Sequence, residues 1–471
     1  MGAKGKIGLI GLAVMGANLA RNLAGHGIST VVYNRSRDKT ENFLKEFGSD
    51  PNLSGAAALE ELVNSLEKPR KIILMIKAGE AVDAMMAKLV PFLEKGDILI
   101  DGGNSFFEDT RRRSREMEAL GFHFVGMGVS GGEEGALHGP SLMPGGAREA
   151  YDVLAPILKA VSAKAEGEAC VDYMGADGAG HYVKMVHNGI EYADMQMIAD
   201  TYFVMKNVLG MTAEDMADTW EMWNKGELSS YLVEITARIL RKADEMTGKP
   251  LVDVILDVAK QKGTGRWTSM SALALGVPAP TITEAVFART MSSQKEERLV
   301  LSERYRDLAF EGAELDRPAV LEDLRQALYA SKICAYAQGF NLLEEAGKVY
   351  GWDLQMGRIA KIWRSGCIIR ARFLDTVSEI FEKESSMTNL LASGYFSQVL
   401  YGARAGWGRI ISLAVKRGAA VPALSSAIAY FDSYHTARGS ANLLQAQRDC
   451  FGAHTYERID KEGAFHTDWM N

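Results

Sequence analysis

Five polar side chains that could carry acid/base chemistry recur with helical spacing in the segment GAGHYVKMVHNGIEY. They are Lys184, His187, Asn188, Glu191 and Tyr192. Separations of three, four, seven and eight residues place them on one helix face, and the opposite positions are mostly apolar. A solvated polar face is the ordinary alternative. Because these residue types seldom gather so closely in an otherwise apolar helix, the pattern favours an acid/base set facing a cleft.

Two of these side chains have complementary proton-transfer properties. A lysine that is desolvated beside other cations loses its proton near neutral pH, so Lys184 is predicted to act as a base. Glu191 lies two turns further along the helix. It is the predicted acid, which would return a proton elsewhere on the same substrate.

A glycine-rich turn near the N-terminus predicts a dinucleotide site. In KIGLIGLAVMGANLARNLAGHG an apolar run enters the turn and a helical pattern follows. Such a turn lets phosphates approach the backbone and the helix N-terminus. Ala13 stands where the middle glycine is expected, which predicts phosphates slightly farther out. A purely structural loop is the alternative. The turn consists of Gly11, Leu12, Ala13, Val14, Met15 and Gly16.

The end of the second predicted strand indicates which dinucleotide is bound. Sites for NAD usually place an Asp or Glu here to accept from the ribose 2′-OH. This chain has Asn34, Arg35, Ser36 and Arg37 instead. Two arginines without an opposing carboxylate suit a 2′-phosphate, so NADP is predicted. A solvated basic turn is the alternative.

Alternating strand and helix patterns fill the first third of the chain, whose length of 471 residues predicts more than one domain. Helices are predicted at Ala13–Ala24 and Phe107–Ala119. Alternation of this kind predicts a doubly wound parallel α/β sheet, a Rossmann-like dinucleotide-binding domain. The predicted strands are Lys6–Ile10, Thr30–Tyr33, Lys71–Ile76, Ile98–Asp101, His123–Val125 and Cys170–Tyr173.

Helical periods dominate from Asp177 onward, beginning with a helix near Gly178 that could run to Val208. The predicted division is an NADP-binding domain at 1–176, an all-α substrate and dimerisation domain at 177–435, and a C-terminal tail at 436–471. The tail is rich in Gly, Asn, Gln and Arg, which favours an extended arm over another core helix.

A weak internal repeat lies in the helical half. MADTWEMWNKGEL at Met216–Leu228 aligns without a gap with MGRIAKIWRSGCI at Met356–Ile368, 140 residues later. Chance similarity between two helical stretches is the alternative. Because each copy follows a long helix, duplication is favoured.

Composition excludes several classes of protein. A net charge of -7 and a pI near 5.8 argue against a nucleic-acid coat or a membrane-surface role. No run reaches the roughly 18 apolar residues of a membrane span. The four cysteines form no CxxC pair, so neither a metal site nor a disulfide framework is suggested, and a reducing cytoplasmic setting fits. An anionic ligand would need a local basic cluster.

Seven motifs carry a family resemblance through their order and spacing. They are GLAVMGANLARN, NRS, DGGNS, GVSGGEEGA, GHYVKMVHNGIEYADMQ, QKGTGRWT and RDCFGAHTYER. Over its whole length the chain resembles the NADP-dependent, decarboxylating 6-phosphogluconate dehydrogenases of the β-hydroxyacid dehydrogenase superfamily. In that family Ala13 is the usual residue of the turn. The resemblance implies oxidation and decarboxylation of 6-phosphogluconate to ribulose 5-phosphate in the pentose phosphate pathway, by a homodimer and without a metal.

The resemblance also implies roles for individual residues. NADP would contact the glycine turn, Asn34, Arg35, Ser36, Ile76, Lys77, Ala78 and Asn104. The substrate would contact Asn104, Ser130, Gly131, Gly132, His187, Asn188, Tyr192, Lys262, Thr264 and Arg289, with Arg448 and His454 supplied by the partner subunit. Without the resemblance, a plain helix-ending turn would explain Lys262 equally well, and Arg289 would be assigned to a solvated surface. An ordinary tail histidine is the alternative for His454.

Two other functions compete with this one. A short-chain β-hydroxyacid dehydrogenase, for example of 3-hydroxyisobutyrate type, would share the glycine turn and the Lys184/Asn188 pair. It would not need the repeated helical half or the basic phosphate set. A non-catalytic NADP-sensing protein would tolerate loss of Lys184 or Glu191, and both are present.

Overall fold

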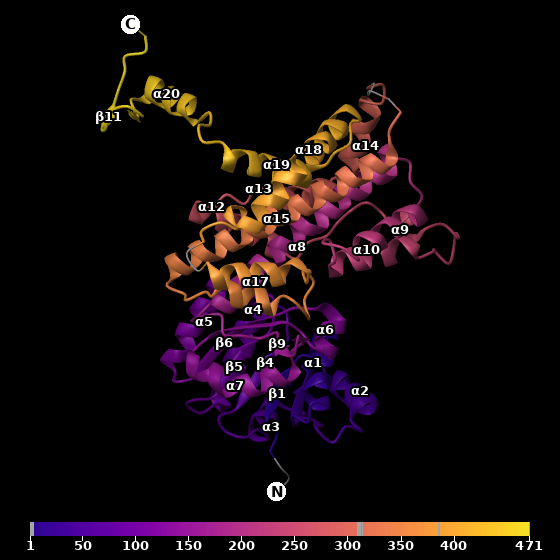
Figure 1. Cartoon of the computed structure of the whole chain (residues 1–471). Coiled ribbons are helices and arrows are strands. Elements are labelled where there is room, and N and C mark those ends of the chain that lie inside the picture. The colour runs from indigo at the N-terminus through magenta and orange to yellow at the C-terminus, as the bar shows by residue number, and fades with distance from the viewer. Residues whose placement is uncertain (1–3, 309–311, 313, 385–386, 471) are drawn as a thin grey trace.

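The computed structural model describes residues 4–308, 312, 314–384 and 387–470. Figure 1 shows an α/β layer at the N-terminal end, a larger body of helices above it, and a C-terminal tail that projects from the helices. The predicted fold class, a Rossmann-like domain followed by a largely helical region, is confirmed.

Within the described residues, seven strands form one sheet in the order β3-β2-β1-β4-β5-β6-β7. All neighbours are parallel except β6 and β7, which are antiparallel. The strands are β1 (Ile7–Ile10), β2 (Thr30–Tyr33), β3 (Leu53–Gly55), β4 (Lys71–Leu74), β5 (Ile98–Asp101), β6 (His123–Val129) and β7 (Leu142–Gly146).

Helices cover both faces of this sheet. Helices α1 and α7 bury apolar side chains such as Leu23 and Leu158 against one face, and α3, α4 and α5 bury Leu62, Met86 and Met117 against the other. The helices of this part are α1 (Val14–Gly25), α2 (Arg37–Phe47), α3 (Leu59–Asn64), α4 (Glu80–Leu89), the 3-10 turn η1 (Val90–Phe92), α5 (Phe107–Ala119), α6 (Gly132–His138) and α7 (Arg148–Val161).

Two details of the predicted sheet were wrong. The segment Cys170–Tyr173 is not a strand; it makes a single bridge, between Val171 and Leu142, and follows the small hairpin of β8 (Lys164–Ala165) and β9 (Glu168–Ala169). The sheet instead contains two strands that were not predicted, β3 and β7, and the β7 sequence LMPGG reads as a loop. Pro144 is tolerated because β7 lies at the edge of the sheet, where the missing N–H costs no ladder bond.

The helical region is built around two long buried helices, α8 (Ala179–Phe203) and α15 (Arg317–Tyr350), which pack on each other. A π-helical turn, η2 (Val204–Val208), continues α8 to the predicted end. The others are α9 (Ala213–Trp223), α10 (Tyr231–Arg241), α11 (Leu251–Val254), α12 (Thr264–Leu275), α13 (Pro280–Ser293), α14 (Lys295–Arg304), α16 (Met356–Ile362), α17 (Phe373–Lys383), the 3-10 turn η3 (Leu390–Ala392), α18 (Gly394–Lys416) and α19 (Pro422–His435).

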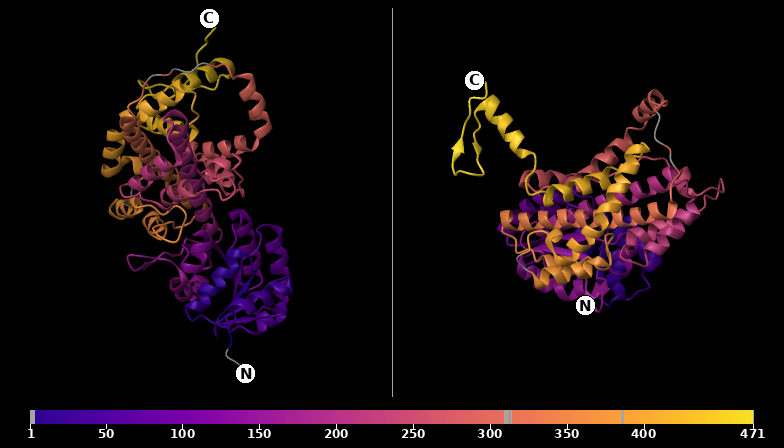
Figure 2. Two further views of the ribbon diagram at one scale, coloured as in Figure 1. Left: turned by 90° about the vertical axis from the view of Figure 1, so that its right-hand side faces the viewer. Right: turned by 45° about the horizontal axis from the view of Figure 1, so that its top comes forward.

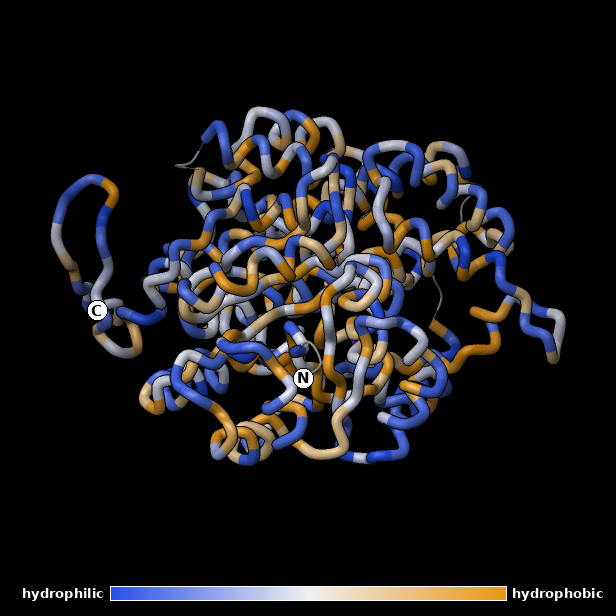
Figure 3. The backbone as a smooth tube through the Cα atoms, turned by 90° about the horizontal axis from the view of Figure 1, so that it is seen from below, coloured by the Kyte–Doolittle hydropathy of each residue, from blue (hydrophilic) through white to orange (hydrophobic). Residues whose placement is uncertain are grey.

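The tail lies apart from the helical body in Figure 1 and in the right-hand view of Figure 2, and its outer loop is mostly hydrophilic in Figure 3. It is more structured than the predicted extended arm. It contains α20 (Ala441–Gly452) and a hairpin of β10 (Tyr456–Glu457) and β11 (Ala464–Phe465). The carboxylate of Asp449 joins these pieces, because it accepts hydrogen bonds from Thr455 N, Thr467 N and Trp469 Nε1.

Membrane insertion finds no support in the helices. None of those formed by the described residues is long and apolar enough to cross a bilayer.

Candidate active site

Helix α8 carries the predicted acid/base face, and its first turns lie directly on β6 and β7. Glycines make this close approach possible. A Cβ on Gly128 would lie 2.4 Å from the Cβ of Lys184, and a Cβ on Gly180 would lie 2.2 Å from the carbonyl oxygen of Gly126. The helix therefore rests on the strand backbones, and Lys184 is only 5% exposed.

The polar side chains of this face contact one another. Lys184 Nζ lies 3.4 Å from His187 Nδ1, which is 3.0 Å from Asn188 Oδ1. Asn188 Nδ2 donates to Thr264 Oγ1 at 3.2 Å, so its oxygen faces the histidine. This arrangement favours a proton on His187 Nδ1 and leaves Nε2 to accept from Ser130 Oγ at 3.2 Å. The predicted polar face is therefore a buried, connected group.

Burial sets the protonation of this group. Desolvation lowers the pKa of Lys184, although the charge of Glu191 opposes the shift. Desolvation likewise lowers the pKa of His187, and the charge of Lys184 adds to the effect. Burial raises the pKa of Glu191, against the attraction of Lys184 and Arg289. A lysine with a lowered pKa thus lies two turns from a carboxyl with a raised pKa.

The loop after β6 forms the opposite wall. Ser130 is buried, and Gly131 and Gly132 follow with φ of +106° and +62°, values that favour glycine. A Cβ on Gly131 would lie 2.6 Å from the carbonyl oxygen of Gly366. The backbone of this wall, which is predicted to hold the carboxylate end of the substrate, therefore packs against the backbone of the helical region at Gly366.

Several predicted phosphate ligands gather beside Glu191. The Arg289 guanidinium carbon lies 3.5 Å from the centre of the Tyr192 ring, a cation–π contact. Thr264 is buried at the start of α12. Lys262 lies in the loop just before that helix and is exposed. The structure thus brings Tyr192, Thr264 and Arg289 to the acid/base face and leaves Lys262 at the rim of this group.

The glycine turn has the geometry of a phosphate cradle. Gly11 has φ of +104°, and a Cβ there would lie 2.3 Å from the carbonyl oxygen of Met75. A Cβ on Gly16 would lie 1.9 Å from the carbonyl oxygen of Gly11. The first turn of α1 carries no acidic residue, and no described side chain caps it. Its free backbone N–H groups and exposed Val14 therefore suit an anionic dinucleotide.

The end of β2 distinguishes the two arginines near the predicted 2′-phosphate site. Asn34 Oδ1 accepts from Leu12 N at 3.1 Å and so joins β2 to the glycine turn. Arg37 is held by Glu41, with Nε 2.7 Å from Oε1. Arg35 is exposed, and none of the described residues hydrogen-bonds or ion-pairs with it. Arg35 is therefore the better-placed cation for a phosphate.

The remaining predicted NADP contacts lie in loops that follow β4 and β5. The segment Ile76–Ala78 begins two residues after β4 ends, and Asn104 comes three residues after β5 ends. Asn104 is exposed, and no described residue hydrogen-bonds to its side chain. Both loops lie at the carboxyl edge of the sheet, where doubly wound folds bind ligands.

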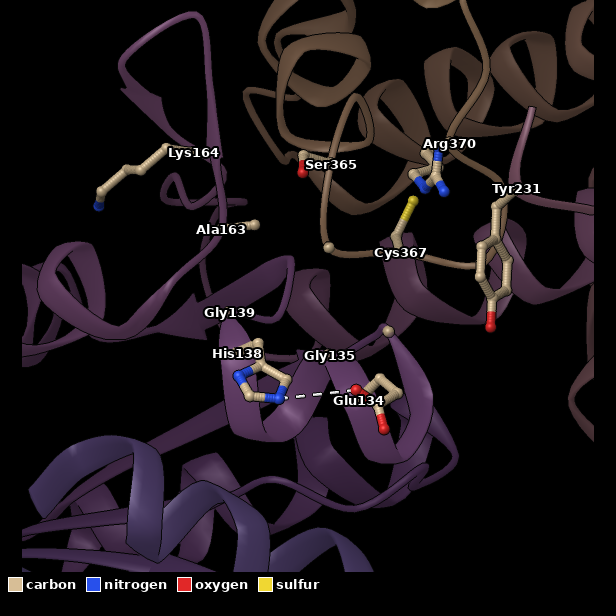
Figure 4. A pocket seen from close by; sticks show the side chains of 12 residues that line it. Glu134, Gly135, His138, Gly139, Ala163, Lys164, Tyr231, Ser365, Cys367 and Arg370 are labelled. Carbon is tan, nitrogen blue, oxygen red and sulfur yellow. Dashed lines mark ion pairs between the residues drawn. The ribbon is translucent and has the colours of Figure 1, made fainter. Parts of the chain in front are cut away.

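A cavity of about 370 Å³ adjoins the Gly131 wall (Figure 4). It lies between α6 and the segment that carries Cys367 and Arg370, with Tyr231 at one side. Burial raises the pKa of the Cys367 thiol to about 12, which keeps it protonated at neutral pH. The cavity thus shares Gly131 with the candidate site, and this thiol contributes no further acid or base to it.

Arg448 and His454 are not brought to this site by their own chain. Both are exposed in the tail, which projects away from the α/β layer in Figures 1 and 2. Arg448 Nη1 donates to Gln445 Oε1 within the same helix, and the His454 ring contacts Phe451.

Sequence reasoning missed buried charges next to the site. Lys332 on α15 places its Nζ 2.6 Å from both carboxylate oxygens of Asp194, and both side chains are buried. Asp194 lies one turn beyond Glu191 on α8. A lone lysine within an apolar helix was the only available signal, and its partner lies 138 residues away.

Comparison with known proteins gives one family over the whole chain. Residues 6–175 match the NAD binding domain of 6-phosphogluconate dehydrogenase, and residues 180–469 match the C-terminal domain of 6-phosphogluconate dehydrogenase. A decarboxylating, NADP(+)-dependent 6-phosphogluconate dehydrogenase of Bacillus subtilis is 57% identical over 99% of this chain and 100% of that protein. The decarboxylating enzyme of Escherichia coli is 53% identical over 100% of both.

A solved structure agrees with these matches. The 6-phosphogluconate dehydrogenase of Plasmodium falciparum superposes with a TM-score of 0.95 at 43% identity, over 98% of this chain and 100% of that one. That enzyme was solved in its apo form, with its cofactor NADP+ and with its substrate 6-phosphogluconate.

Proposed function

Because this chain belongs to the 6-phosphogluconate dehydrogenase family, we propose that the buried face of α8 performs its acid/base chemistry. The chain catalyses the NADP-dependent oxidative decarboxylation of 6-phosphogluconate to ribulose 5-phosphate, a step of the pentose phosphate pathway. The observation that supports the catalytic assignment is that one helix face carries both buried Lys184, with a lowered pKa, and partly buried Glu191, with a raised pKa.

In the proposed mechanism Lys184 acts first. NADP, when bound at the glycine turn, supplies the acceptor for the hydride from C3. Neutral Lys184 takes the proton of the C3 hydroxyl as that hydride leaves. Its ammonium form then polarises the 3-keto oxygen and returns the proton to it as the C1 carboxylate departs as carbon dioxide.

Glu191 completes the reaction. It delivers its proton to C1 of the five-carbon enediol, the former C2 of the substrate, while the enol proton goes back to Lys184 and the ketone of ribulose 5-phosphate forms. The cycle leaves Lys184 protonated and Glu191 ionised, so net transfer of one proton from lysine to glutamate restores the resting pair. Their opposite pKa shifts support that direction of transfer.

The binding roles form part of the same proposal. Ser130, Gly131 and Gly132 hold the carboxylate end, and His187 and Asn188 hold hydroxyls. Tyr192, Lys262, Thr264 and Arg289 hold the phosphate, and Asn104 contacts both ligands. NADP contacts the turn from Gly11 to Gly16, the segments Asn34–Ser36 and Ile76–Ala78, and Asn104. The contacts of His187 with Ser130, and of Asn188 with Thr264, support a single shared pocket.

A direct assay tests this function against its rivals. Purified protein receives 6-phosphogluconate with NADP or with NAD, and NADPH absorbance and carbon dioxide release are followed together. Equal yields of both products with NADP are expected. Turnover of 3-hydroxyisobutyrate without carbon dioxide would favour the short-chain alternative, and NADP binding without any turnover would favour a sensing role.

We further propose a three-part organisation and a duplicated helical region. The parts are 1–176, 177–435 and 436–471. The order α8, α9, α10 recurs as α15, α16, α17, and α10 begins at Tyr231 whereas α17 begins at Phe373, 142 residues later. Helices α13 and α19 also begin 142 residues apart, at Pro280 and Pro422. This spacing supports duplication at the offset of 140 seen in the sequence.

Assembly as a homodimer with shared sites is a separate proposal. The tail exposes large apolar side chains, including Leu444, Phe451 and Ile459, which its own chain leaves uncovered. A partner subunit would cover them and receive Arg448 and His454 at its substrate phosphate.

The free state of all four cysteines, each within the described residues, supports a cytoplasmic location.

A mixing experiment tests the shared site. Subunits with Lys184→Met and with Arg448→Ala are each nearly inactive as homodimers under this proposal. In a mixed dimer with shared sites one site carries both lesions and the other carries none, so about half of the activity per mixed dimer returns. Purified mixed dimers that stay inactive would reject the shared site.

A further inference from the structure

A guanidinium that is completely enclosed by protein lies beneath the carboxyl edge of the sheet. Arg113 on α5 is 0% exposed, whereas its neighbour Arg112 is half-exposed. Arg113 Nε and Nη2 donate to the two carboxylate oxygens of Asp83, each at 2.8 Å. A buried arginine is retained only where its charge is compensated, and this bidentate pair does so.

The same guanidinium reaches two loops that follow neighbouring strands. Its Nη2 also donates to the carbonyl oxygen of Gly79 at 3.0 Å, directly after Ile76–Ala78. Its Nη1 lies 3.6 Å from Asp101 Oδ2 and has no hydrogen-bond partner among the described residues. Asp101 ends β5, and β5 pairs with β4. One planar group therefore spans the loop after β4 and the loop after β5.

Asp101 in turn fixes the conformation around Asn104. Its Oδ1 accepts from Gly103 N at 3.0 Å, and its Oδ2 accepts from Ser105 Oγ at 2.6 Å. The residues on both sides of Asn104 are thus tied to one buried carboxylate. Asn104 itself is left exposed and without a protein partner among the described residues.

We propose that Arg113 is a positioning residue that sets the spacing between the loop Ile76–Gly79 and the loop Asp101–Ser105. This inference rests on the proposed function, because it is through these loops that NADP and substrate are proposed to bind. Only a rigid fork of several donors can engage Asp83, Gly79 and the Asp101 side at once; the single ammonium of a lysine cannot.

The strand order predicts which part of the cofactor depends on Arg113. In the sheet β2 lies on one side of β1, whereas β4 and β5 lie on the other. A dinucleotide that crosses this edge at β1 has its 2′-phosphate half near Arg35 and its nicotinamide half over the loops after β4 and β5. Loss of the loop spacing should therefore weaken NADP but spare 2′,5′-ADP, which has only the first half.

Calorimetric titration of the full-length dehydrogenase tests this inference. Arg113→Lys is expected to raise the Kd for NADP by about 10-fold or more, with a lower kcat, while the Kd for 2′,5′-ADP changes less than about 2-fold. Arg112→Lys is the matched control, because Arg112 also binds Asp83, with Nη2 2.8 Å from Oδ1, but reaches neither loop. Its two Kd values should stay at the wild-type level.

Two results would overturn the inference: an unchanged Kd for NADP in folded Arg113→Lys, or equal weakening of NADP and 2′,5′-ADP. If Arg113→Lys does not fold, Ser105→Ala, which removes one hydroxyl from Asp101, replaces it with the same expected direction. The two Kd values, for NADP and for 2′,5′-ADP, are measured without turnover, whereas the proposed function is tested by turnover of the wild-type enzyme. The two can therefore fail separately.

Discussion

Replacement of Lys184 by Met should remove catalysis while leaving the fold and cofactor binding intact. The side chain is 5% exposed, and its Nζ has one hydrogen-bond partner among the described residues, His187 Nδ1 at 3.4 Å. Methionine has a similar length and no charge to bury. The free energy of unfolding should therefore stay the same or rise, because burial of the lysine removes water that would stabilise its ammonium form, and methionine has no such cost.

The size of the expected kinetic effect follows from the two roles that we propose for this lysine. A positioned general base is worth about 10²–10⁴-fold in rate, and a buried electrostatic stabiliser is worth about 10²–10³-fold. Since both are lost together, kcat should fall at least roughly 10⁴-fold. The Kd for NADP should change less than about 2-fold, since the glycine turn lies on another element.

Initial rates of NADPH formation and calorimetric titration with NADP measure the two quantities. Lys206→Met is a suitable control, since Lys206 follows on the same helical run in η2 but pairs with Asp253 at the surface. A Lys184→Met enzyme with kcat within tenfold of wild type would refute the assignment. A large rise in KM at normal kcat would instead assign Lys184 to substrate binding alone.

Three further predictions concern titration and charge. Glu191→Gln should lower kcat by about 10²–10⁴-fold. The activity of the wild-type enzyme should have a bell-shaped pH dependence, because the proposed mechanism needs neutral Lys184 and protonated Glu191, whereas the activity of the variant should only rise with pH. A variant whose activity still falls at alkaline pH would contradict the role of Glu191. Arg35→Ala should raise the Kd for NADP about tenfold or more. Arg37→Ala should have little effect on this Kd, because Arg37 is already paired with Glu41. If calorimetry shows equal rises in Kd for the two variants, Arg35 is not the specific contact of the 2′-phosphate. Burial raises the pKa of Asp200 to about 7, so the folded protein holds a proton that the unfolded chain loses above about pH 4, and stability falls as pH rises toward 7. Asp200→Asn should reduce that fall between pH 5 and pH 8 by about 3 kcal/mol in urea unfolding, and an unchanged pH dependence would show that Asp200 is not its source.

Local pattern was sufficient for most of the elements that position the site. The strands Thr30–Tyr33 and Ile98–Asp101 and the helix Phe107–Ala119 have the predicted bounds, because each is a short apolar run or an amphipathic period between turn residues. The edge strand β7 could not be predicted in this way. Its Pro and two Gly residues normally indicate a loop, and only its pairing with β6 makes it a strand.

Local pattern was also insufficient for contacts between distant segments. The bonds of His187 with Ser130 and of Asn188 with Thr264 join residues 57 and 76 positions apart. Arg113 lies in the run RRRSRE, whose composition predicts a solvated helix face, yet it is buried. Whether an arginine in such a run is enclosed depends on the carboxylates that other elements supply, here Asp83 on α4.

The acid/base character of α8 depends on small residues in elements that carry no reactive group. On a solvated surface the same polar face would keep ordinary pKa values, because water would stabilise the ammonium of Lys184 and the carboxylate of Glu191. It is the absence of side chains at Gly126 and Gly128 in β6 and at Gly180 in α8 that lets this helix lie on the strand backbones. A methyl group on Gly128 would meet the stem of Lys184 at 2.4 Å and push α8 outward, so water would enter and the pKa of Lys184 would rise toward its ordinary value. The chemistry of the helical region is thus set at its contact with the sheet that holds the cofactor.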